Sequence, residues 1–412
     1  MTAAELEFRM QPFFEPRWLE SWIVRRMRSR LIHGHASPTG QHPRRLFVDV
    51  SVICRNDAAT GIQRIVRAVA TDLLRNPPAG WQTIAVGATR KRPYRKVPWQ
   101  DGSVPGDFLS GRAGDVFLGL DFSLDDIHRH RRQLTEFARC GGRMWFFMYD
   151  LLPIQRPEWF SSKLVVRFRR WLRSIAGLAT GFFCISASVE AALLSTLVQR
   201  YGVNDVQTAV VPMGWDLGEA RSDRGQHTGV DAVLQAARSH PTALMVGTIE
   251  PRKGHADVLS AFDRLWNQGS AARLVIVGRP GWKNDALEAR IMSHPRKDTH
   301  LFWLRDASDE ALEKVYAACH GVIAASHSEG YGLPVIEALG RNKPVLARDI
   351  DVFRAHHHRG VSFFPSASGP DALAAAIDRW IVMPTSPWTE PTATFGTWKD
   401  TVQSVVCELS RD

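Results

Sequence analysis

The chain has 412 residues, a length that is typical of two or three domains. Hydrophobic residues make up 44% and charged residues 23%, which is ordinary for a globular enzyme and excludes a disordered or fibrous protein for most of the length. No apolar run reaches the ~18 residues that a membrane span needs, because glycine and serine interrupt the longest candidate, residues 175–189. We interpret that segment as a buried strand with its flanks.

Positive charge is concentrated in the first half of the sequence. Residues 1–215 contain 30 Lys and Arg against 18 Asp and Glu, whereas residues 216–412 contain 22 against 24, so the net charge of +10 comes from the first half. An excess confined to one half indicates contact with an anionic surface, such as lipid head groups, phosphate or nucleic acid. A basic globular protein without such a partner has the same composition.

The N-terminal segment lacks the basic and then apolar pattern of a secretory signal. Five scattered cysteines include no CxxC pair, namely Cys54, Cys140, Cys184, Cys319 and Cys407. An odd, scattered set argues against a disulfide framework or a zinc site and favours a reducing compartment. The expected location is the cytoplasm, with the inner face of the cytoplasmic membrane as an alternative.

The first predicted element is a helix over residues 17–32, where Trp18, Trp22 and Ile23 lie among five arginines. Aromatic and basic residues together are typical of helices that lie in a membrane interface. The apolar positions spread around most of the helical wheel, however, which favours an ordinary packing helix. Peripheral contact with an anionic membrane is the alternative interpretation.

Strand-length apolar runs then alternate with segments of helical period. In the first half, strands are predicted at 46–53, 83–86, 116–120, 144–150, 181–186 and 209–211, with an amphipathic helix at 61–74. In the second half, strands are predicted at 244–247, 274–278, 301–304, 322–325 and 344–347, with helices near 254–267, 284–293, 308–319, 332–341 and 370–382. This alternation, present twice, predicts an α/β fold of two Rossmann-like domains facing each other across a cleft.

The pattern restarts near Pro212 and Gly214, and the polar residues 222–229 suit a linker or loop. We therefore expect a first domain over residues 1–214 and a second over residues 215–384. A last helix at 398–409 follows a proline-rich crossing, so the segment of about 385–412 is expected to pack back on the first domain.

The sharpest motif spans residues 328–338, with the sequence SEGYGLPVIEA. A predicted strand ends before it, two glycines form a tight turn, and a helix begins near Leu333 with proline in its first turn. Glycine allows a ligand to approach the free N–H groups of a helix N-terminus, which form an anion site. The motif therefore predicts a phosphate-binding turn, made by Gly330, Tyr331, Gly332 and Leu333.

Two basic residues, Arg252 and Lys253, stand at the predicted start of another helix. Cations are unfavourable at a helix N-terminus, so we interpret the pair as ligands for a bound anion such as phosphate, with a solvated pair as the alternative. Arg can bind phosphate in a bidentate manner, while Lys acts as a point charge. Thr248 lies in the same loop, and Arg305 after a strand is either a contact to the base or phosphate or a solvated strand end.

The first half offers two further candidates. Gly61, Gln63 and Arg64 open a helix after a strand and a loop, where they either bind a phosphate or sugar or simply cap the helix. Asp150 follows the apolar strand MWFFMY, at the carboxyl end where doubly wound sheets bind ligands. It is a candidate to orient a substrate hydroxyl or to accept its proton.

These motifs resemble the GT-B retaining glycosyltransferases of family four, which carry an E-x7-E signature, here Glu329 and Glu337. In the second half the resemblance also rests on GTIEPRKG at 247–254, on VIVG followed by GW at 275–282, and on PMGWD at 212–216. In the first half RND at 55–57, TGIQR at 60–64 and YDLLP at 149–153 resemble bacterial polysaccharide and O-antigen mannosyltransferases. The resemblance covers roughly residues 46–382.

The resemblance implies retaining transfer of a sugar from a nucleotide-sugar to a growing surface polysaccharide or a lipid-linked glycan, with no metal or other cofactor. Mannose or a related deoxyhexose carried by GDP is the expected donor sugar. Glu329 is expected to bind hydroxyls of that sugar and Glu337 the ribose, both in the second domain, while the first domain holds the acceptor.

Three positions depart from the family pattern. Many relatives carry Arg at the position of Thr248, Glu at that of Ala355 and, in some members, His at that of Tyr149. The alternatives are a UDP-sugar transferase of the same fold and a non-catalytic GT-B scaffold in a polysaccharide assembly. Nucleic-acid binding would explain the basic half but not the glycine-rich loops, so no nucleic-acid partner is expected.

Overall fold

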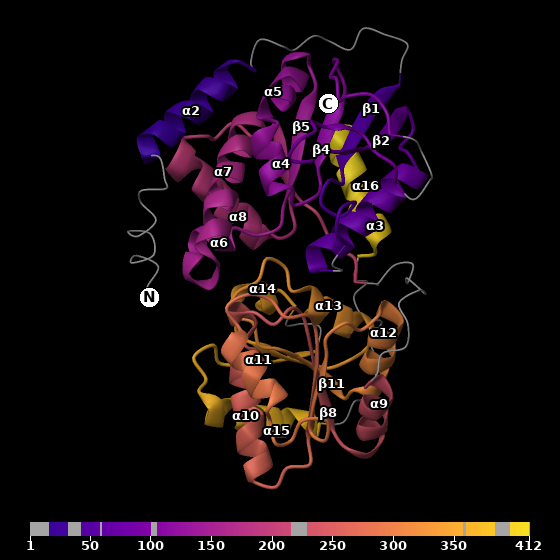
Figure 1. The fold of residues 1–412 in the computed structure, drawn as a ribbon, viewed down its shortest axis with the longest axis vertical. Coiled ribbons are helices and arrows are strands. Elements are labelled where there is room, and N and C mark those ends of the chain that lie inside the picture. Colours follow the sequence, from indigo (N-terminus) through magenta and orange to yellow (C-terminus); the bar gives the residue numbers. More distant parts are fainter. Residues whose placement is uncertain are drawn as a thin grey trace. The chain divides into compact units, whose positions relative to one another are not determined.

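The computed structural model describes residues 16–31, 43–57, 60–99, 105–215, 229–356, 360–383 and 396–411. It divides the chain into two compact units: unit 1 comprises Met1–Gly214 with Trp398–Asp412, and unit 2 comprises Trp215–Thr397. Each unit is built on its own mostly parallel sheet with helices packed against it (Figure 1). The prediction of an α/β fold with two Rossmann-like units is confirmed. The proline-rich crossing and most of the predicted linker at 222–229 lie outside the described residues.

The sheet of unit 1 has seven strands in the order β3-β2-β1-β4-β5-β6-β7. All neighbours pair in parallel except β2 and β3, which are antiparallel. The strands are β1 (Arg44–Asp49), β2 (Trp81–Gly87), β3 (Arg95–Lys96), β4 (Val116–Gly119), β5 (Arg143–Met148), β6 (Gly181–Cys184) and β7 (Gln207–Val210). Because β2 and β4 lie on opposite sides of β1, the direction of winding reverses between β1 and β4.

The helices of unit 1 are α2 (Arg17–Ser29), α3 (Gly61–Arg75), α4 (Leu124–Arg129), α5 (Arg131–Arg139), α6 (Leu152–Gln155), α7 (Ser162–Leu178), α8 (Ala187–Thr196) and α16 (Trp398–Leu409). A short π-helix, η3 (Leu197–Tyr201), continues α8. The terminal helix α16 packs against α3, as Figure 1 shows, and Thr401 Oγ1 donates to the Pro212 carbonyl at 2.6 Å. Among the described residues, no helix combines the length and apolarity needed to cross a membrane.

The sheet of unit 2 has six parallel strands in the order β10-β9-β8-β11-β12-β13. The strands are β8 (Thr242–Val246), β9 (Arg273–Val277), β10 (Leu301–Leu304), β11 (Gly321–Ala324), β12 (Val345–Arg348) and β13 (Val361–Phe364). The α-helices are α9 (Val230–Ser239), α10 (His255–Asn267), α11 (Asp285–Met292), α12 (Asp309–Ala318), α13 (Leu333–Gly340), α14 (Asp351–Arg354) and α15 (Pro370–Ile381). A short 3-10 helix, η4 (Pro251–Lys253), precedes α10.

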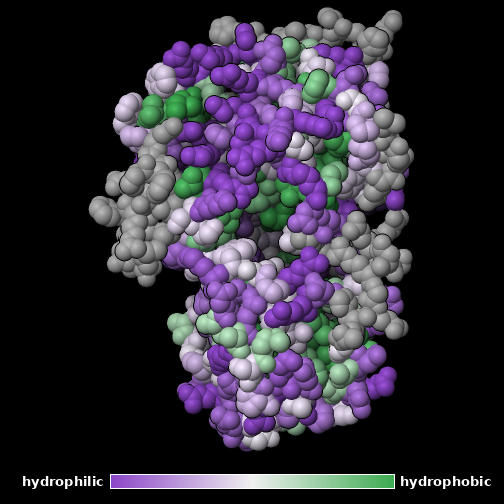
Figure 2. Space-filling model, viewed as in Figure 1, coloured by the Kyte–Doolittle hydropathy of each residue, from purple (hydrophilic) through white to green (hydrophobic). Residues whose placement is uncertain are grey.

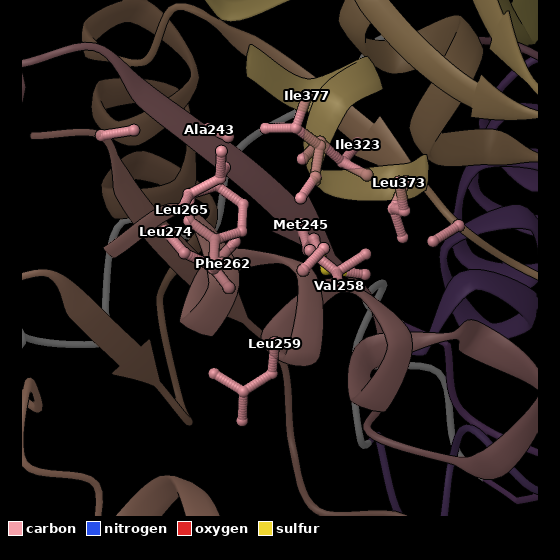
Figure 3. Close-up of a cluster of buried hydrophobic side chains, with 14 of the residues drawn as sticks. Ala243, Met245, Val258, Leu259, Phe262, Leu265, Leu274, Ile323, Leu373 and Ile377 are labelled. Carbon is pink, nitrogen blue, oxygen red and sulfur yellow. The ribbon is translucent and has the colours of Figure 1, made fainter. Parts of the chain in front are cut away.

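The core of unit 2 lies between the sheet and the packed pair α10 and α15. Figure 3 shows Phe262 and Leu265 of α10 near Ala243 and Leu274 of the sheet, while Ile377 of α15 lies close to Ile323 of β11. The apolar face of α10 repeats at helical spacing, and burial of each such side chain contributes about 1.5–3 kcal/mol. This packing holds the N-terminus of α10 at the carboxyl edge of the sheet.

Three predicted strands end two or more residues earlier than expected. The strands predicted at 46–53, 144–150 and 181–186 end at Asp49, Met148 and Cys184 in the structure. For β1 the cause is a side chain from the segment that follows the neighbouring strand β4: the Asp121 carboxylate accepts the N–H groups of Val52 and Ile53 at 2.6 and 2.8 Å. The chain therefore turns immediately after β1 instead of continuing the ladder.

Candidate functional site

The carboxyl edge of the unit 2 sheet has one point where the winding reverses, between β8 and β11. In doubly wound sheets, ligands bind in the crevice at such a point, outside the carboxyl ends of the strands. The loop 247–254 follows β8 and the loop 325–332 follows β11. These two loops contain seven of the residues that the sequence singled out.

Glycine brings these two loops into contact. Gly254 has φ +71°, and a Cβ on it would lie 2.2 Å from the Ala325 carbonyl oxygen, so only glycine fits there. A backbone hydrogen bond also joins the two loops: the His327 N–H donates to the Arg252 carbonyl at 2.7 Å. The side chains of η4 are thereby held beside the residues that follow β11.

A charged cluster forms where the loops meet; it consists of Glu250, Arg252, Lys253, Ser326 and Glu329. The Glu329 carboxylate contacts Arg252 Nη1 at 2.7 Å and Lys253 Nζ at 2.5 Å. It also accepts a hydrogen bond from Ser326 Oγ at 2.6 Å. On its other side, Arg252 pairs with Glu250 at 2.7 Å. The sequence predicted Arg252, Lys253 and Glu329, but it did not single out Glu250 or Ser326.

The charges in this cluster set the ionisation of Glu329. Burial alone would raise the pKa of this carboxyl, but the charges of Arg252 and Lys253 outweigh burial and hold the pKa at about 2. Glu329 is therefore a carboxylate at every physiological pH. A group that is always ionised can accept hydrogen bonds but cannot donate a proton during a reaction.

Helix α13 begins at the same edge of the sheet. Its N-cap, Gly332, has φ +90°, and a Cβ there would lie 2.6 Å from the Phe353 ring. Pro334 occupies the first turn, as predicted. Glu337 lies inside α13, is buried, and accepts a hydrogen bond from Tyr316 Oη of α12 at 2.9 Å. Tyr316 was not found from the sequence, because it precedes the motif by twelve positions or more.

The remaining predicted residues of unit 2 are not members of the charged cluster. Thr248 follows Gly247 in the loop after β8, and Gly330 and Leu333 flank the turn before α13. The Tyr331 ring meets His356 edge-on at a centroid distance of 6.0 Å. Arg305 is not part of the cluster: it stacks over Trp303 at 4.0 Å and pairs with Glu288 at 3.6 Å, beyond the end of the edge strand β10.

A buried histidine, His255, begins α10 directly behind the cluster. It lines a cavity of ≈ 20 Å³ together with Lys253, Ser326 and Glu329. Burial, with a smaller effect of the Lys253 charge, lowers the pKa of His255 to about 3, so its ring is neutral. Neither ring nitrogen has a hydrogen-bond partner among the described residues, and a cavity of this size has room for one water molecule.

Unit 1 has a second polar cluster at its own reversal point, between β1 and β4. Asp49, the last residue of β1, accepts hydrogen bonds from Ser51 Oγ and Ser123 Oγ at 2.5 Å and from Tyr94 Oη at 3.0 Å. Burial, with a smaller effect of the nearby Asp121 charge, raises the pKa of Asp49 to about 7. The cluster underlies the turn at 51–57, which carries the RND motif.

The predicted residues around α3 fasten this turn. Thr60 and Gln63 form a capping box at the start of α3, and the Gln63 side-chain amide donates to the Asn56 carbonyl at 2.6 Å. Gly61 and Arg64 lie in the same first turn of α3, so the structure brings all three predicted residues together. Asp150 lies beyond β5, where its carboxylate accepts the Leu152 N–H at 3.2 Å at the start of α6.

Residues 231–388 match the family described as Glycosyl transferases group 1. The matched range lies within unit 2 and includes Arg252, Lys253, Glu329 and Glu337. The chain carries a group 1 glycosyltransferase domain. The charged cluster and the N-terminus of α13 thus both belong to the glycosyltransferase domain.

Relatives of known name extend the likeness beyond this domain. The chain is 35% identical over 353 residues to the serotype-specific mannosyltransferase WbdA of Escherichia coli. The aligned residues cover 83% of this chain and 42% of WbdA. It is 33% identical over 160 residues to a D-inositol 3-phosphate glycosyltransferase of Nocardia farcinica, and this alignment covers 37% of this chain and 35% of that protein. The chain therefore spans less than half the length of these curated relatives.

Several solved structures share the fold of this chain. HepE of Anabaena, solved with UDP and glucose, has a TM-score of 0.63 at 14% identity and covers 90% of this chain and 100% of its own. WaaG, a glycosyltransferase involved in lipopolysaccharide biosynthesis, has a TM-score of 0.56 at 11% identity, and the match covers 89% of this chain and 100% of the WaaG chain. These likenesses confirm the predicted GT-B fold.

Proposed function

We propose that this chain transfers mannose, or a related sugar, from a nucleotide-sugar to a glycan acceptor, with retention at the anomeric carbon. The observation that carries the proposal is the charged cluster at the reversal point of a group 1 glycosyltransferase domain. Two cations and the N-terminus of α13 meet there, and both favour a bound diphosphate. The 35% identity to a mannosyltransferase over most of the chain supports mannose as the sugar.

In the proposed reaction, the bond between the anomeric carbon and the diphosphate oxygen breaks. A bond from that carbon to the acceptor oxygen forms on the same face, and the acceptor proton passes to the departing phosphate oxygen. Arg252 and Lys253 stabilise the charge that develops on the leaving group, which is the largest effect that preorganised groups supply in such sites. We assign no metal to this step, because these cations can carry it.

The proposed roles of the other residues follow from their places. Glu329 accepts hydrogen bonds from the donor sugar, and Glu337, held by Tyr316, accepts them from the ribose. The N–H groups of Tyr331 and Leu333, beside Gly330 and Gly332, receive the phosphates. In unit 1, Asp150 and the first turn of α3 serve the acceptor, and they do so from the carboxyl edge of the sheet, where ligands bind in this fold.

Thermal unfolding in the presence of GDP, UDP, ADP, dTDP and CMP tests the donor site. We expect one nucleotide, GDP on the present proposal, to raise the melting temperature by about 5 °C at a hundredfold excess over its Kd. Glu337→Ala is expected to abolish the shift, because it removes the buried carboxylate proposed to bind the ribose. Glu310→Ala, at an exposed acid on α12, serves as the matched control and keeps the shift.

The outcome also separates the alternatives. A shift with UDP and none with GDP would place the chain among UDP-sugar transferases. If none of the five nucleotides and none of their sugar conjugates shifts the melting temperature, the transferase proposal is wrong and a non-catalytic scaffold takes its place.

The proposal includes peripheral contact with an anionic membrane, from the cytoplasmic side, through α2. One face of this helix packs on unit 1: Val24 is buried there, and the buried Glu20 pairs with Arg200 at 2.7 Å. On this face α2 is an ordinary packing helix. Its other face leaves Trp18 71% and Trp22 52% exposed, with Arg26 over the Trp22 ring at 5.1 Å. In Figure 2 hydrophobic and hydrophilic residues lie side by side where Figure 1 places α2. Exposed tryptophan beside arginine fits an interface with anionic lipids.

Sedimentation with phosphatidylcholine vesicles containing about 30% phosphatidylserine tests this contact. The double variant Trp18→Ser/Trp22→Ser is expected to reduce the bound fraction at least about fivefold, because two interfacial rings are lost. Phe108→Ser removes a ring elsewhere on unit 1 whose exposure, 64%, lies between those of Trp18 and Trp22, and is expected to bind as the native chain does. Equal binding by all three proteins, or binding that ignores phosphatidylserine, would show that α2 does not touch the membrane.

A further inference from the structure

The charged cluster of unit 2 carries no net charge. Arg252 and Lys253 supply two positive charges, and the carboxylates Glu250 and Glu329 supply two negative charges. All four side chains are largely buried: those of the two cations are 15% and 13% exposed, and those of Glu250 and Glu329 2% and 9%. The cations proposed to hold a diphosphate are therefore already neutralised by the chain itself.

Glu329 is bonded to the cations as a phosphate would be. Its two oxygens are divided between them, one on Arg252 Nη1 at 2.7 Å and the other on Lys253 Nζ at 2.5 Å. Charge-assisted bonds of this length are the strongest hydrogen bonds that proteins form. A diphosphate that needs the same two donors must take them from Glu329, at least in part.

Displacing Glu329 leaves its carboxylate in a poorly solvated place without a counter-charge. An uncompensated buried charge is strongly unfavourable, so the displacement opposes binding unless new donors reach the carboxylate. The hydroxyls of a sugar attached to the diphosphate are such donors. A nucleoside diphosphate without the sugar has none to offer in their place.

We propose, on the basis of the function proposed above, that Glu329 competes with the diphosphate for Arg252 and Lys253, yields when a sugar is attached, and returns after transfer. The competition makes the site prefer the nucleotide-sugar over the nucleoside diphosphate. It also weakens binding of the product, because the sugar that satisfied Glu329 has left. Glu329 thus determines donor specificity and promotes product release.

Calorimetric titration of the full chain with inorganic pyrophosphate tests the competition without any contribution from a base or a sugar. Glu329→Gln keeps the shape of the side chain and removes its charge, so pyrophosphate is expected to bind at least about tenfold more tightly than to the native chain. The same variant is expected to lose at least about tenfold of the preference for GDP-mannose over GDP. Equal or weaker pyrophosphate binding by Glu329→Gln would overturn the proposal.

Two further variants make the result specific to Glu329. Glu250→Gln removes a negative charge on the other side of Arg252, so it is expected to tighten GDP and GDP-mannose alike and leave their ratio unchanged. A changed ratio in Glu250→Gln would mean that net charge, and not Glu329, sets the preference, and it would overturn the proposal. Ser326→Ala keeps all four charges and removes one hydrogen bond to Glu329, and it is expected to tighten pyrophosphate about twofold even if Glu329→Gln fails to fold.

The experiment distinguishes failure of this inference from failure of the proposed function. If neither GDP-mannose nor a UDP-sugar binds while Glu329→Gln still gains pyrophosphate affinity, the competition stands and the donor assignment is wrong. If GDP binds and pyrophosphate affinity does not change with Glu329→Gln, the donor assignment stands and the competition is wrong.

Discussion

Lys253→Met is expected to lower kcat/KM for sugar transfer by roughly 10²- to 10³-fold, the usual cost of removing one preorganised group that stabilises charge in a transition state. The Lys253 ammonium lies 2.5 Å from Glu329 and is 13% exposed, so it acts in a poorly solvated site where its charge is little screened. Methionine keeps the length of the side chain without the charge. Initial rates with GDP-mannose and a mannose-containing acceptor measure the effect.

The control for this prediction is Lys314→Met, which removes an exposed lysine of α12 that pairs with Glu310 within the same helix. Such surface pairs contribute little, and activity is expected to remain within twofold of the native value. The fold of Lys253→Met is expected to persist, because Arg252 still pairs with Glu329. A rate for Lys253→Met within threefold of the native rate would remove Lys253 from the catalytic machinery.

Most of the order of strands and helices in unit 2 was predictable because each strand from β8 to β12 is a short apolar run bounded by glycine or polar residues. The strand predicted at 301–304 has those bounds in the structure, and the helix predicted near 254–267 is α10, His255–Asn267. The edge strand β13 and the helices α9 and α14 were not predicted. Three of the four residues of β13 are only half-buried, so its sequence lacks the continuous apolar run of the inner strands.

The sequence could not predict where β1 ends. The apolar run from Leu46 to Ile53 favours a strand throughout, yet β1 stops at Asp49. The reason is a contact between residues almost 70 positions apart, in which Asp121 binds the N–H groups of Val52 and Ile53. Local periodicity carries no information about such a contact.

In the site too, the sequence predicted which residues take part but not which side chains pair with one another. Spacing and glycine turns predicted Arg252, Lys253 and Glu329, because helix N-termini with glycine have a recognisable sequence. Nothing in the spacing indicates that Glu329 binds Arg252 and Lys253 across 77 and 76 positions, and this pairing is part of what makes the cluster neutral. The pairing of Glu337 with Tyr316 was hidden in the same way.

For Gln63 the structure adds a role to the predicted one. The side chain was expected to bind substrate, or else to cap the helix, and the capping box with Thr60 is present. Its amide also holds the Asn56 carbonyl, so Gln63 fixes the turn that follows β1. The turn is therefore shaped by its own motif residues.

The buried carboxyl of Asp49 is expected to make the stability of unit 1 depend on pH. In the folded chain burial raises its pKa to about 7, whereas in the unfolded chain the ordinary value near 3.8 applies. Between these two values the folded chain holds the proton and the unfolded chain does not. The free energy of unfolding therefore decreases as pH rises from about 4 to about 7, and between pH 5 and pH 8 the decrease from this one group is about 2–3 kcal/mol.

Asp49→Asn is expected to remove this dependence, because the amide of asparagine does not ionise. Amide hydrogen exchange of β1 and β4 reports the opening of unit 1 separately from unit 2, and comparison of the two proteins at each pH cancels the intrinsic exchange rate. The native chain is expected to lose stability relative to Asp49→Asn on going from pH 5 to pH 8. Asp107→Asn, at an exposed acid of the same unit, is expected to follow the native curve. Parallel curves for the native chain and Asp49→Asn would mean that Asp49 is ionised throughout this range, with its charge carried by the hydroxyls of Ser51, Tyr94 and Ser123.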